Sequence, residues 1–153
     1  MTSQASDQSA SEMLELSREE CLRLLKSQSF GRLAVNIGKG PPVIRPVNYF
    51  FDERSQSVVF RTAVGSKFHG VLKSAEAAFE VDRVEGASRT GWSVIVQGVT
   101  DEVTHPSEVR RLDDLGLDPW APGYQAHWIQ IRAWTVSGRR IVVAADGSPG
   151  QRV

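Results

Sequence analysis

The sequence contains one cysteine, Cys21, among its 153 residues. This excludes an internal disulfide and favours a reducing, cytoplasmic location. No apolar run approaches the ~20 residues that a membrane-spanning helix needs, and the N-terminus lacks the basic and then apolar layout of a secretion signal. Net charge is also absent, because 18 basic residues balance 18 acidic ones. We therefore expect no partner among nucleic acids or membranes.

Residue patterns that mark hydrolytic or metal chemistry are missing as well. The three histidines, His69, His105 and His127, have no metal-ligand spacing, and no cysteine or acidic residue completes a set with them. Asp113 and Asp114 are neighbours on a predicted helix and point in different directions, so they make a poor acid/base pair. The sequence therefore predicts no metal site and names no catalytic residue.

What is present is the composition of a soluble globular domain, with 41% apolar and 24% charged residues. The chain length suits a single domain with a real core. Residues 1–12 are dominated by Ser, Gln, Ala and Asp, so they are predicted to form a disordered tail. Residues 13–145 are expected to form the domain, and 146–153 a flexible C-terminal tail.

The spacing of apolar residues predicts a helix followed by strands. Ser17 and Glu20 fit a capping box, and Cys21, Leu24 and Leu25 share one face, which predicts a helix over 17–28. Short helices are expected over 66–73 and after Pro106. Period-two patterns and turn signals predict strands over 33–37, 43–51, 57–62, 77–84, 92–103, 126–136 and 139–144, the last two joined at Ser137-Gly138. We expect a mainly β fold, an antiparallel barrel with a few short helices, because the first connections are too short for parallel crossovers.

The stretch from Val58 to Lys67 carries the clearest chemical signal. An apolar strand ends in Arg61 and Thr62, and Gly65 then precedes a predicted helix that opens with Ser66 and Lys67. Free amides at a helix start attract an anion, and hydroxyl and guanidinium groups add directed donors. This pattern predicts a phosphate site, although a strand-end Arg and a helix-start Lys are also common as solvated surface charges.

The order of several motifs resembles the pyridoxamine 5'-phosphate oxidase-like flavin split-barrel family, and in particular its small actinobacterial-type members. The resemblance covers about residues 16–143. It rests on Gly31-Arg32-Leu33-Ala34-Val35, Pro46-Val47-Asn48-Tyr49, Phe60-Arg61-Thr62 with Gly65-Ser66-Lys67, Phe79-Glu80-Val81-Asp82, Gly91-Trp92-Ser93-Val94 with Gln97-Gly98, and Gly138-Arg139-Arg140-Ile141.

This resemblance implies a homodimeric, six-stranded split barrel that binds FMN, or a deazaflavin coenzyme, in a groove between subunits. By the same resemblance the cofactor phosphate is held by Arg61, Thr62, Ser66 and Lys67. The isoalloxazine ring is expected beside Val47 and Asn48, with Trp92 near the site and Gln97 reaching it from the other subunit. Asn48 has an equally good interpretation as a residue that satisfies a turn. The C-terminal Gly138-Arg139-Arg140 only loosely matches the substrate-binding Arg and His residues of true pyridoxamine phosphate oxidases.

Two classes of function remain open from the sequence. One is an oxidoreductase in which a flavin carries the chemistry and a small molecule is the substrate or electron donor. The other is a non-enzymatic flavin- or haem-binding carrier or sensor. A nucleic-acid-binding barrel is a weaker alternative, because the sequence lacks a basic stripe with interleaved aromatic residues.

Overall fold

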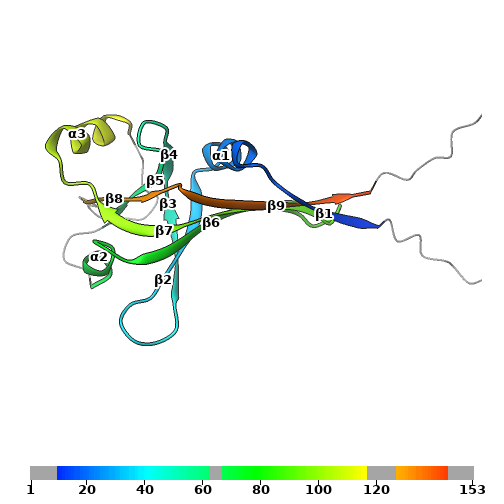
Figure 1. Ribbon diagram of the computed structural model, residues 1–153, viewed down its shortest axis with the longest axis horizontal. Helices are drawn as coiled ribbons and strands as arrows, with labels where there is room; N and C mark the ends of the chain where they lie inside the picture. The colour runs from blue at the N-terminus through cyan, green and yellow to red at the C-terminus, as the bar shows by residue number, and fades with distance from the viewer. Residues whose placement is uncertain (1–9, 63–66, 117–126, 145–153) are drawn as a thin grey trace, which may run out of the picture.

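The computed structural model describes residues 10–62, 67–116 and 127–144 (Figure 1). In these ranges the chain forms three helices and nine strands. They run in the order β1 Ser11–Glu15, α1 Arg18–Ser27, β2 Phe30–Val35, β3 Val43–Asn48, β4 Phe50–Asp52, β5 Ser57–Thr62, α2 Lys67–Val71, β6 Glu76–Glu85, β7 Thr90–Glu102, α3 Pro106–Asp114, β8 His127–Arg132 and β9 Thr135–Val143.

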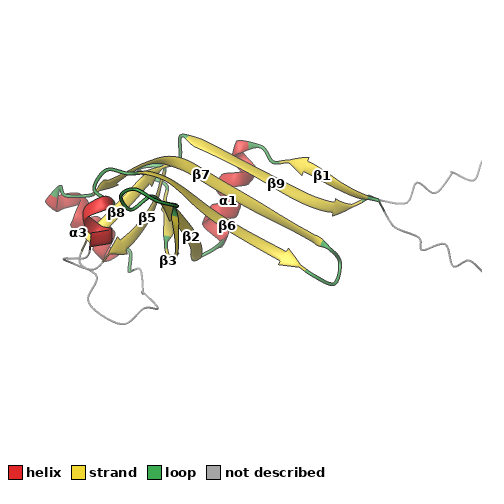
Figure 2. Cartoon of the chain, turned by 90° about the horizontal axis from the view of Figure 1, so that it is seen from below, coloured by secondary structure: helices red, strands yellow, loops and turns green. Residues whose placement is uncertain are grey.

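All strand pairs are antiparallel, and one long strand organises them. The sheet order is β3-β2-β6-β7-β8-β5-β4, with β9 also on β7 and β1 on β9. Strand β7 pairs with β9 through residues 91–97 and with β8 through residues 100–102. The first part of β7 and its last part therefore have different neighbours. The sheet curls until β3 contacts β5, while β6, β7, β9 and β1 extend away from the curled body (Figures 1 and 2). This confirms the predicted mainly β, antiparallel barrel-type fold.

The strand count differs from the six that the resemblance implies, because the described residues form nine. One cause is a break at Tyr49. The expected strand over 43–51 is divided there into β3, which pairs with β2, and β4, which pairs with β5. The backbone amide of Tyr49 donates to the carbonyl of Ser29 instead of continuing a ladder. A second cause is β1, which begins at Ser11, so residues 11 and 12 belong to the sheet and not to the predicted tail.

The predicted turn at Ser137-Gly138 was wrong. These two residues lie inside β9, opposite Ile95 and Val94 of β7, and the turn between β8 and β9 lies at Ala133-Trp134. A Cβ atom on Gly138 would stand 2.7 Å from the Sγ of Cys21 and 3.0 Å from a backbone oxygen of β7. The glycine therefore permits α1 to pack closely on the sheet.

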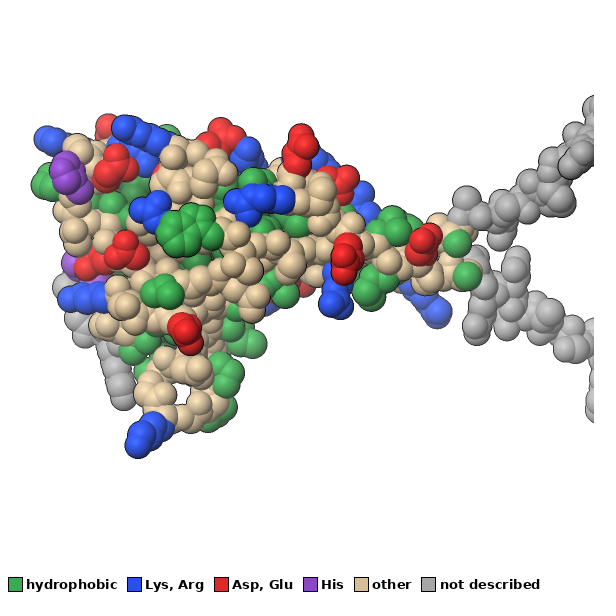
Figure 3. Space-filling view, in the orientation of Figure 1, with side chains coloured by type: hydrophobic (Ala, Val, Ile, Leu, Met, Phe, Trp, Pro, Cys, Tyr) green, Lys and Arg blue, Asp and Glu red, His purple; other side chains and the backbone are tan. Residues whose placement is uncertain are grey.

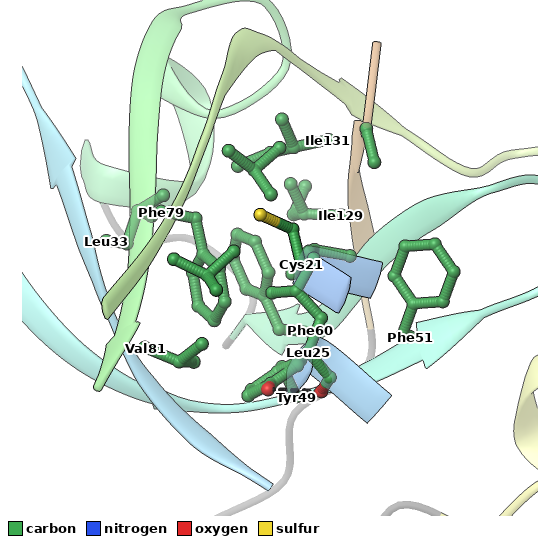
Figure 4. Packing of buried hydrophobic residues seen from close by; sticks show 14 of the residues in the cluster. Cys21, Leu25, Leu33, Tyr49, Phe51, Phe60, Phe79, Val81, Ile129 and Ile131 are labelled. Carbon is green, nitrogen blue, oxygen red and sulfur yellow. Dashed lines mark hydrogen bonds between the residues drawn. The ribbon is translucent and has the colours of Figure 1, made fainter. Parts of the chain in front are cut away.

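The main hydrophobic cluster fills the inner face of the curled sheet, under α1. Its members come from α1 and the curled strands, and Figure 4 shows them around the Cys21 thiol, among them Leu33, Phe60, Phe79 and Ile131. Helix α1 begins as predicted, because the hydroxyl of Ser17 accepts from the amide of Glu20 at 3.2 Å. A smaller cluster of Val59, Leu112 and Trp128 lies between α3 and the outer face of β5 and β8.

Among the described helices, none has the length and apolar character needed to cross a membrane.

Candidate functional site

The predicted phosphate segment joins the end of β5 to α2. Thr62 is the last residue of β5, and Lys67 is the first residue of α2. Ser66 lies outside the described residues, and of Lys67 the structure describes only its position in the chain. The side chains of Arg61 and Thr62 are described, and their positions decide how this segment can meet an anion.

Arg61 and Thr62 lie on opposite faces of β5, because successive strand residues alternate. Arg61 is on the outer face, opposite Trp128 of β8. Its guanidinium carbon lies 4.2 Å from the centre of the Trp128 ring, and its Nη2 lies 2.7 Å from Oδ1 of Asp113 on α3. The buried Nε of Arg61 has no hydrogen-bond partner among the described residues. The guanidinium therefore keeps one unused donor, and that donor is buried beneath the outer surface.

Thr62 is on the inner face, where its hydroxyl is already engaged. The side chain is buried, and Oγ1 lies 2.9 Å from Nδ1 of His69 on α2. The two side chains of the Arg61-Thr62 pair thus point to different sides of the sheet. In this structure Arg61 and Thr62 therefore do not offer their side-chain donors to the same face of the sheet.

Val47 and Asn48 are neighbours on β3, and they also alternate. Val47 is partly buried and packs against the main hydrophobic cluster. Asn48 is half-buried beside Phe30, its partner on β2. Of this pair, Asn48 is therefore the residue that can present a side chain to the outer face.

Trp92 and Gln97 lie on the same strand but are separated. They are five residues apart on β7, which corresponds to about 16 Å at the rise of an extended strand. Trp92 packs against the main hydrophobic cluster, whereas Gln97 is exposed on the outer face beside Ile95 and Val99. Within one chain these two side chains cannot contact the same ring.

Gln97 lines a groove of about 530 Å³ that also involves Gly98 and Val99 of β7, parts of β2 and β6, and Pro42. This volume falls within the range of about 300–1,000 Å³ that is usual for small-molecule sites. The predicted site residues that face outward are therefore Asn48, Arg61 and Gln97. Those that face inward are Val47, Thr62 and Trp92.

Hydrophobic side chains also reach the outer surface, and Figure 3 shows such side chains between charged ones. Exposed examples are Ile44 of β3 at 62% and Val99 of β7 at 54%, together with Trp134 at 78%. Trp134 lies in the β8–β9 turn.

The carboxylate of Glu80 lies on the outer face of the sheet, between β2 and β7. Glu80 of β6 lies opposite Arg32 of β2 and Ile95 of β7. Burial raises the pKa of Glu80 and the carboxylate of Asp82 raises it further, while Arg32 opposes both effects.

The structure also assembles a cluster that the sequence pattern did not reveal. His69 of α2, Glu102 at the end of β7 and His127 at the start of β8 place one nitrogen or oxygen ligand atom each within 4.8 Å of the others. The expectation that no acidic residue completes a set with the histidines was wrong, because the pairing of β7 with β8 brings Glu102 beside His127. Only the fold joins these residues, which are far apart in the sequence.

Comparison with known proteins identifies the family of this chain. Residues 17–140 match the family described as pyridoxamine 5'-phosphate oxidase. The chain is 40% identical over 143 residues to the uncharacterized protein Rv0080 of Mycobacterium tuberculosis, covering 90% of this chain and 91% of the relative. The chain therefore belongs to the pyridoxamine 5'-phosphate oxidase-like family.

Solved structures agree with this assignment. The FAD binding protein from Mycobacterium smegmatis is 31% identical with a TM-score of 0.69, covering 82% of this chain and 95% of that protein. A conserved protein of unknown function from Corynebacterium diphtheriae is 35% identical with a TM-score of 0.71, covering 85% of this chain and 98% of that protein. The curled antiparallel sheet is thus shared along nearly the whole of each relative.

Proposed function

We propose that this protein binds a flavin, with FMN as the expected cofactor, and acts as a flavin-dependent oxidoreductase. The observation that carries the proposal is the match to the FAD binding protein from Mycobacterium smegmatis, which is 31% identical and aligns over 95% of its length. Membership of the pyridoxamine 5'-phosphate oxidase-like family supports the same class of cofactor.

Side chains on the outer face suit a flavin. The Arg61 guanidinium is held in place by Trp128 and Asp113, yet its buried Nε has no partner among the described residues. Because this donor is buried, a phosphate reaches it only when the neighbouring side chains move, and it would then form a charge-assisted hydrogen bond. Gln97 lines a groove of about 530 Å³, large enough for an aromatic ring system, and its amide can donate to a ring carbonyl.

A homodimer with the cofactor in a groove between subunits accounts for the spread of these residues. The outward-facing candidates Asn48, Arg61 and Gln97 come from β3, β5 and β7, which are separated within the sheet. Apolar side chains such as Ile44 and Val99 are exposed on the same strands, and exposed apolar surface is typical of an interface. A second copy on this face would cover the apolar residues and enclose the groove.

In this arrangement the chain supplies binding and orientation. Arg61 positions the phosphate, while Gln97 and Asn48 fix the edge of the ring through hydrogen bonds. The flavin, when bound, supplies the hydride or electron transfer. Packing of the second subunit over the groove excludes water, which strengthens each of these polar contacts.

The proposal is tested by mass spectrometry of the small molecule released from the purified protein. We expect FMN, and a flavin absorbance spectrum before release. Recovery of FAD or of a deazaflavin coenzyme would replace FMN as the cofactor, while the protein would still bind a cofactor of the flavin type. Turnover with NAD(P)H or a reduced deazaflavin then separates an enzyme from a carrier. A protein that carries no such molecule, and that takes up neither FMN, FAD nor a deazaflavin on reconstitution, contradicts the proposal.

A further inference from the structure

His69, Glu102 and His127 come from three elements that meet at one end of the curled sheet. Figure 1 shows α2 beside the ends of β7 and β8, where these residues lie. Nδ1 of His127 contacts Oε1 of Glu102, and Nε2 of His69 lies 3.5 Å from the same oxygen. The two imidazole rings are 4.2 Å apart between centres and tilted by 36°. Two imidazoles and one carboxylate therefore converge on a small volume.

Burial makes this convergence notable. The side chain of Glu102 is 15% exposed and that of His69 is 9% exposed, whereas His127 is 33% exposed. A carboxylate that is largely withdrawn from water needs a positive partner or several donors. Among the described residues, the groups that form ion pairs with Glu102 are these two histidines, and neither a lysine nor an arginine is among them. A bound cation would supply that positive charge.

The orientation of His69 suits ligation through Nε2. Its Nδ1 lies 2.9 Å from the hydroxyl oxygen of Thr62. In the tautomer in which Nδ1–H donates to Thr62, the lone pair of Nε2 faces Glu102. A hydrogen bond of this kind to the far nitrogen is the usual support for a metal-binding histidine, since it fixes both the tautomer and the ring plane.

We propose that His69, Glu102 and His127 bind a divalent transition-metal ion, of which Zn²⁺ is the best match. Imidazole nitrogen suits Zn²⁺ and its neighbours, whereas Ca²⁺ and Mg²⁺ prefer sites made of oxygen. Three protein ligands leave a fourth tetrahedral position for water or a small ligand. Because Glu102 and His127 are in direct contact, entry of the ion requires a small rotation of the Glu102 side chain. This proposal does not depend on flavin binding.

The ion would link three parts of the fold. It would tie α2, the helix that follows β5 in the chain, to the adjacent ends of β7 and β8. Thr62 then acts as a positioning residue, because it holds His69 and does not itself touch the ion. A hydrogen-bonded His–Glu–His network without metal is the competing interpretation, and the experiment distinguishes the two.

Isothermal titration of Zn²⁺ into chelator-treated protein without a histidine tag tests the site. We expect one ion per chain, and a Co²⁺-substituted protein with the visible absorption of a four-coordinate site. Glu102→Gln keeps the shape of the side chain and His127 is partly exposed, so Glu102→Gln and His127→Ala should fold, as circular dichroism will check. Each is expected to weaken Zn²⁺ binding at least about 100-fold, and Thr62→Val about 10-fold.

His105→Ala is the matched control. His105 is the remaining histidine of the chain and caps α3, with its Nδ1 accepting from the amide of Ser107 at 3.3 Å. Its replacement should leave the Zn²⁺ affinity unchanged. The proposal is overturned if wild-type protein shows no saturable Zn²⁺ binding, which would favour the hydrogen-bonded network. It is also overturned if folded Glu102→Gln and His127→Ala variants bind as tightly as the His105→Ala variant.

Discussion

Arg111 of α3 holds both carboxylate oxygens of Asp52 on β4, with Nη1 at 2.9 Å from Oδ1 and Nη2 at 2.7 Å from Oδ2. This two-point ion pair fastens α3 to the sheet beside the smaller hydrophobic cluster. Burial alone would raise the pKa of Asp52, but hydrogen bonds from Arg111 and Ser55 outweigh it and lower the pKa from 3.8 to about 2.

This pair predicts an acid-sensitive contribution to stability. Because the folded-state pKa is lowered, the contribution is complete above the ordinary pKa near 4 and is lost as the pH falls towards 2. It corresponds to about 2 kcal/mol. In urea unfolding at pH 7, Asp52→Asn should have a free energy of unfolding lower than that of the wild type by this amount. The difference between the two free energies should shrink as the pH falls towards 2. The control Asp114→Asn removes an exposed carboxylate of α3, the helix that carries Arg111. An equal pH dependence for Asp52→Asn and wild type would contradict this account.

Gly138→Ala should destabilise the packing of α1 on β9. The new methyl group would lie 2.7 Å from the Sγ of Cys21, and overpacking of this kind costs about 1–3 kcal/mol. Cys21→Ala removes the sulfur, so the double variant should lose less than the sum of the two single variants, as thermal unfolding can measure. Gly86→Ala is the control, because a Cβ there meets no atom within 4 Å. Strict additivity would show that the contact with Cys21 does not require the glycine.

Tyr49→Phe should cost about 1–2 kcal/mol. The hydroxyl of Tyr49 donates to the carbonyl of Leu25 at 2.6 Å in a buried position (Figure 4). Leu25 is in the last turn of α1, where carbonyls have no partner within the helix. Chemical denaturation provides the measurement, with the exposed hydroxyl of Ser88 removed in Ser88→Ala as a control. A Tyr49→Phe variant as stable as Ser88→Ala would mean that the carbonyl finds another partner.

The proposed dimer face predicts an effect on assembly. Ile95 and Val99 are 36% and 54% exposed on the outer face of β7. Sedimentation velocity should show a dimer for the wild type and a monomer for Ile95→Lys/Val99→Lys, since buried unpaired charges oppose association. Leu115→Lys changes an equally exposed residue after α3 and should leave the dimer intact. A wild-type monomer would contradict the proposed homodimer, and a dimer that tolerates both lysines would place the interface elsewhere.

The elements that local signals define could be predicted from the sequence. The capping box at Ser17 gave the start of α1, and the expected strand 57–62 matches β5, because its turns and apolar run are local. What depends on tertiary approach could not be predicted. Gly138 looks like a turn residue in sequence, yet it lies inside β9 because a helix passes close to it.

The same limit applies to the candidate site. Motif order predicted Arg61 and Gln97 as cofactor-binding residues, and the structure places both on the outer face of the sheet. It could not reveal that Thr62 faces the other way and bonds to His69. Nor could it reveal Glu102 between two histidines, because the pairing of β7 with β8 and the position of α2 create that contact.

Titration of FMN and FAD by flavin fluorescence tests the central claim most directly. We expect about one flavin per chain for the wild type, and a loss of at least about tenfold in affinity for Arg61→Ala, the value expected for one hydrogen bond to a charged group. Arg54→Ala, which removes an exposed arginine, should have no effect. Asp113→Asn removes the negative charge beside Arg61 and should preserve or tighten binding. An absence of flavin binding by the wild type, or an Arg61→Ala affinity equal to that of Arg54→Ala, would contradict the account.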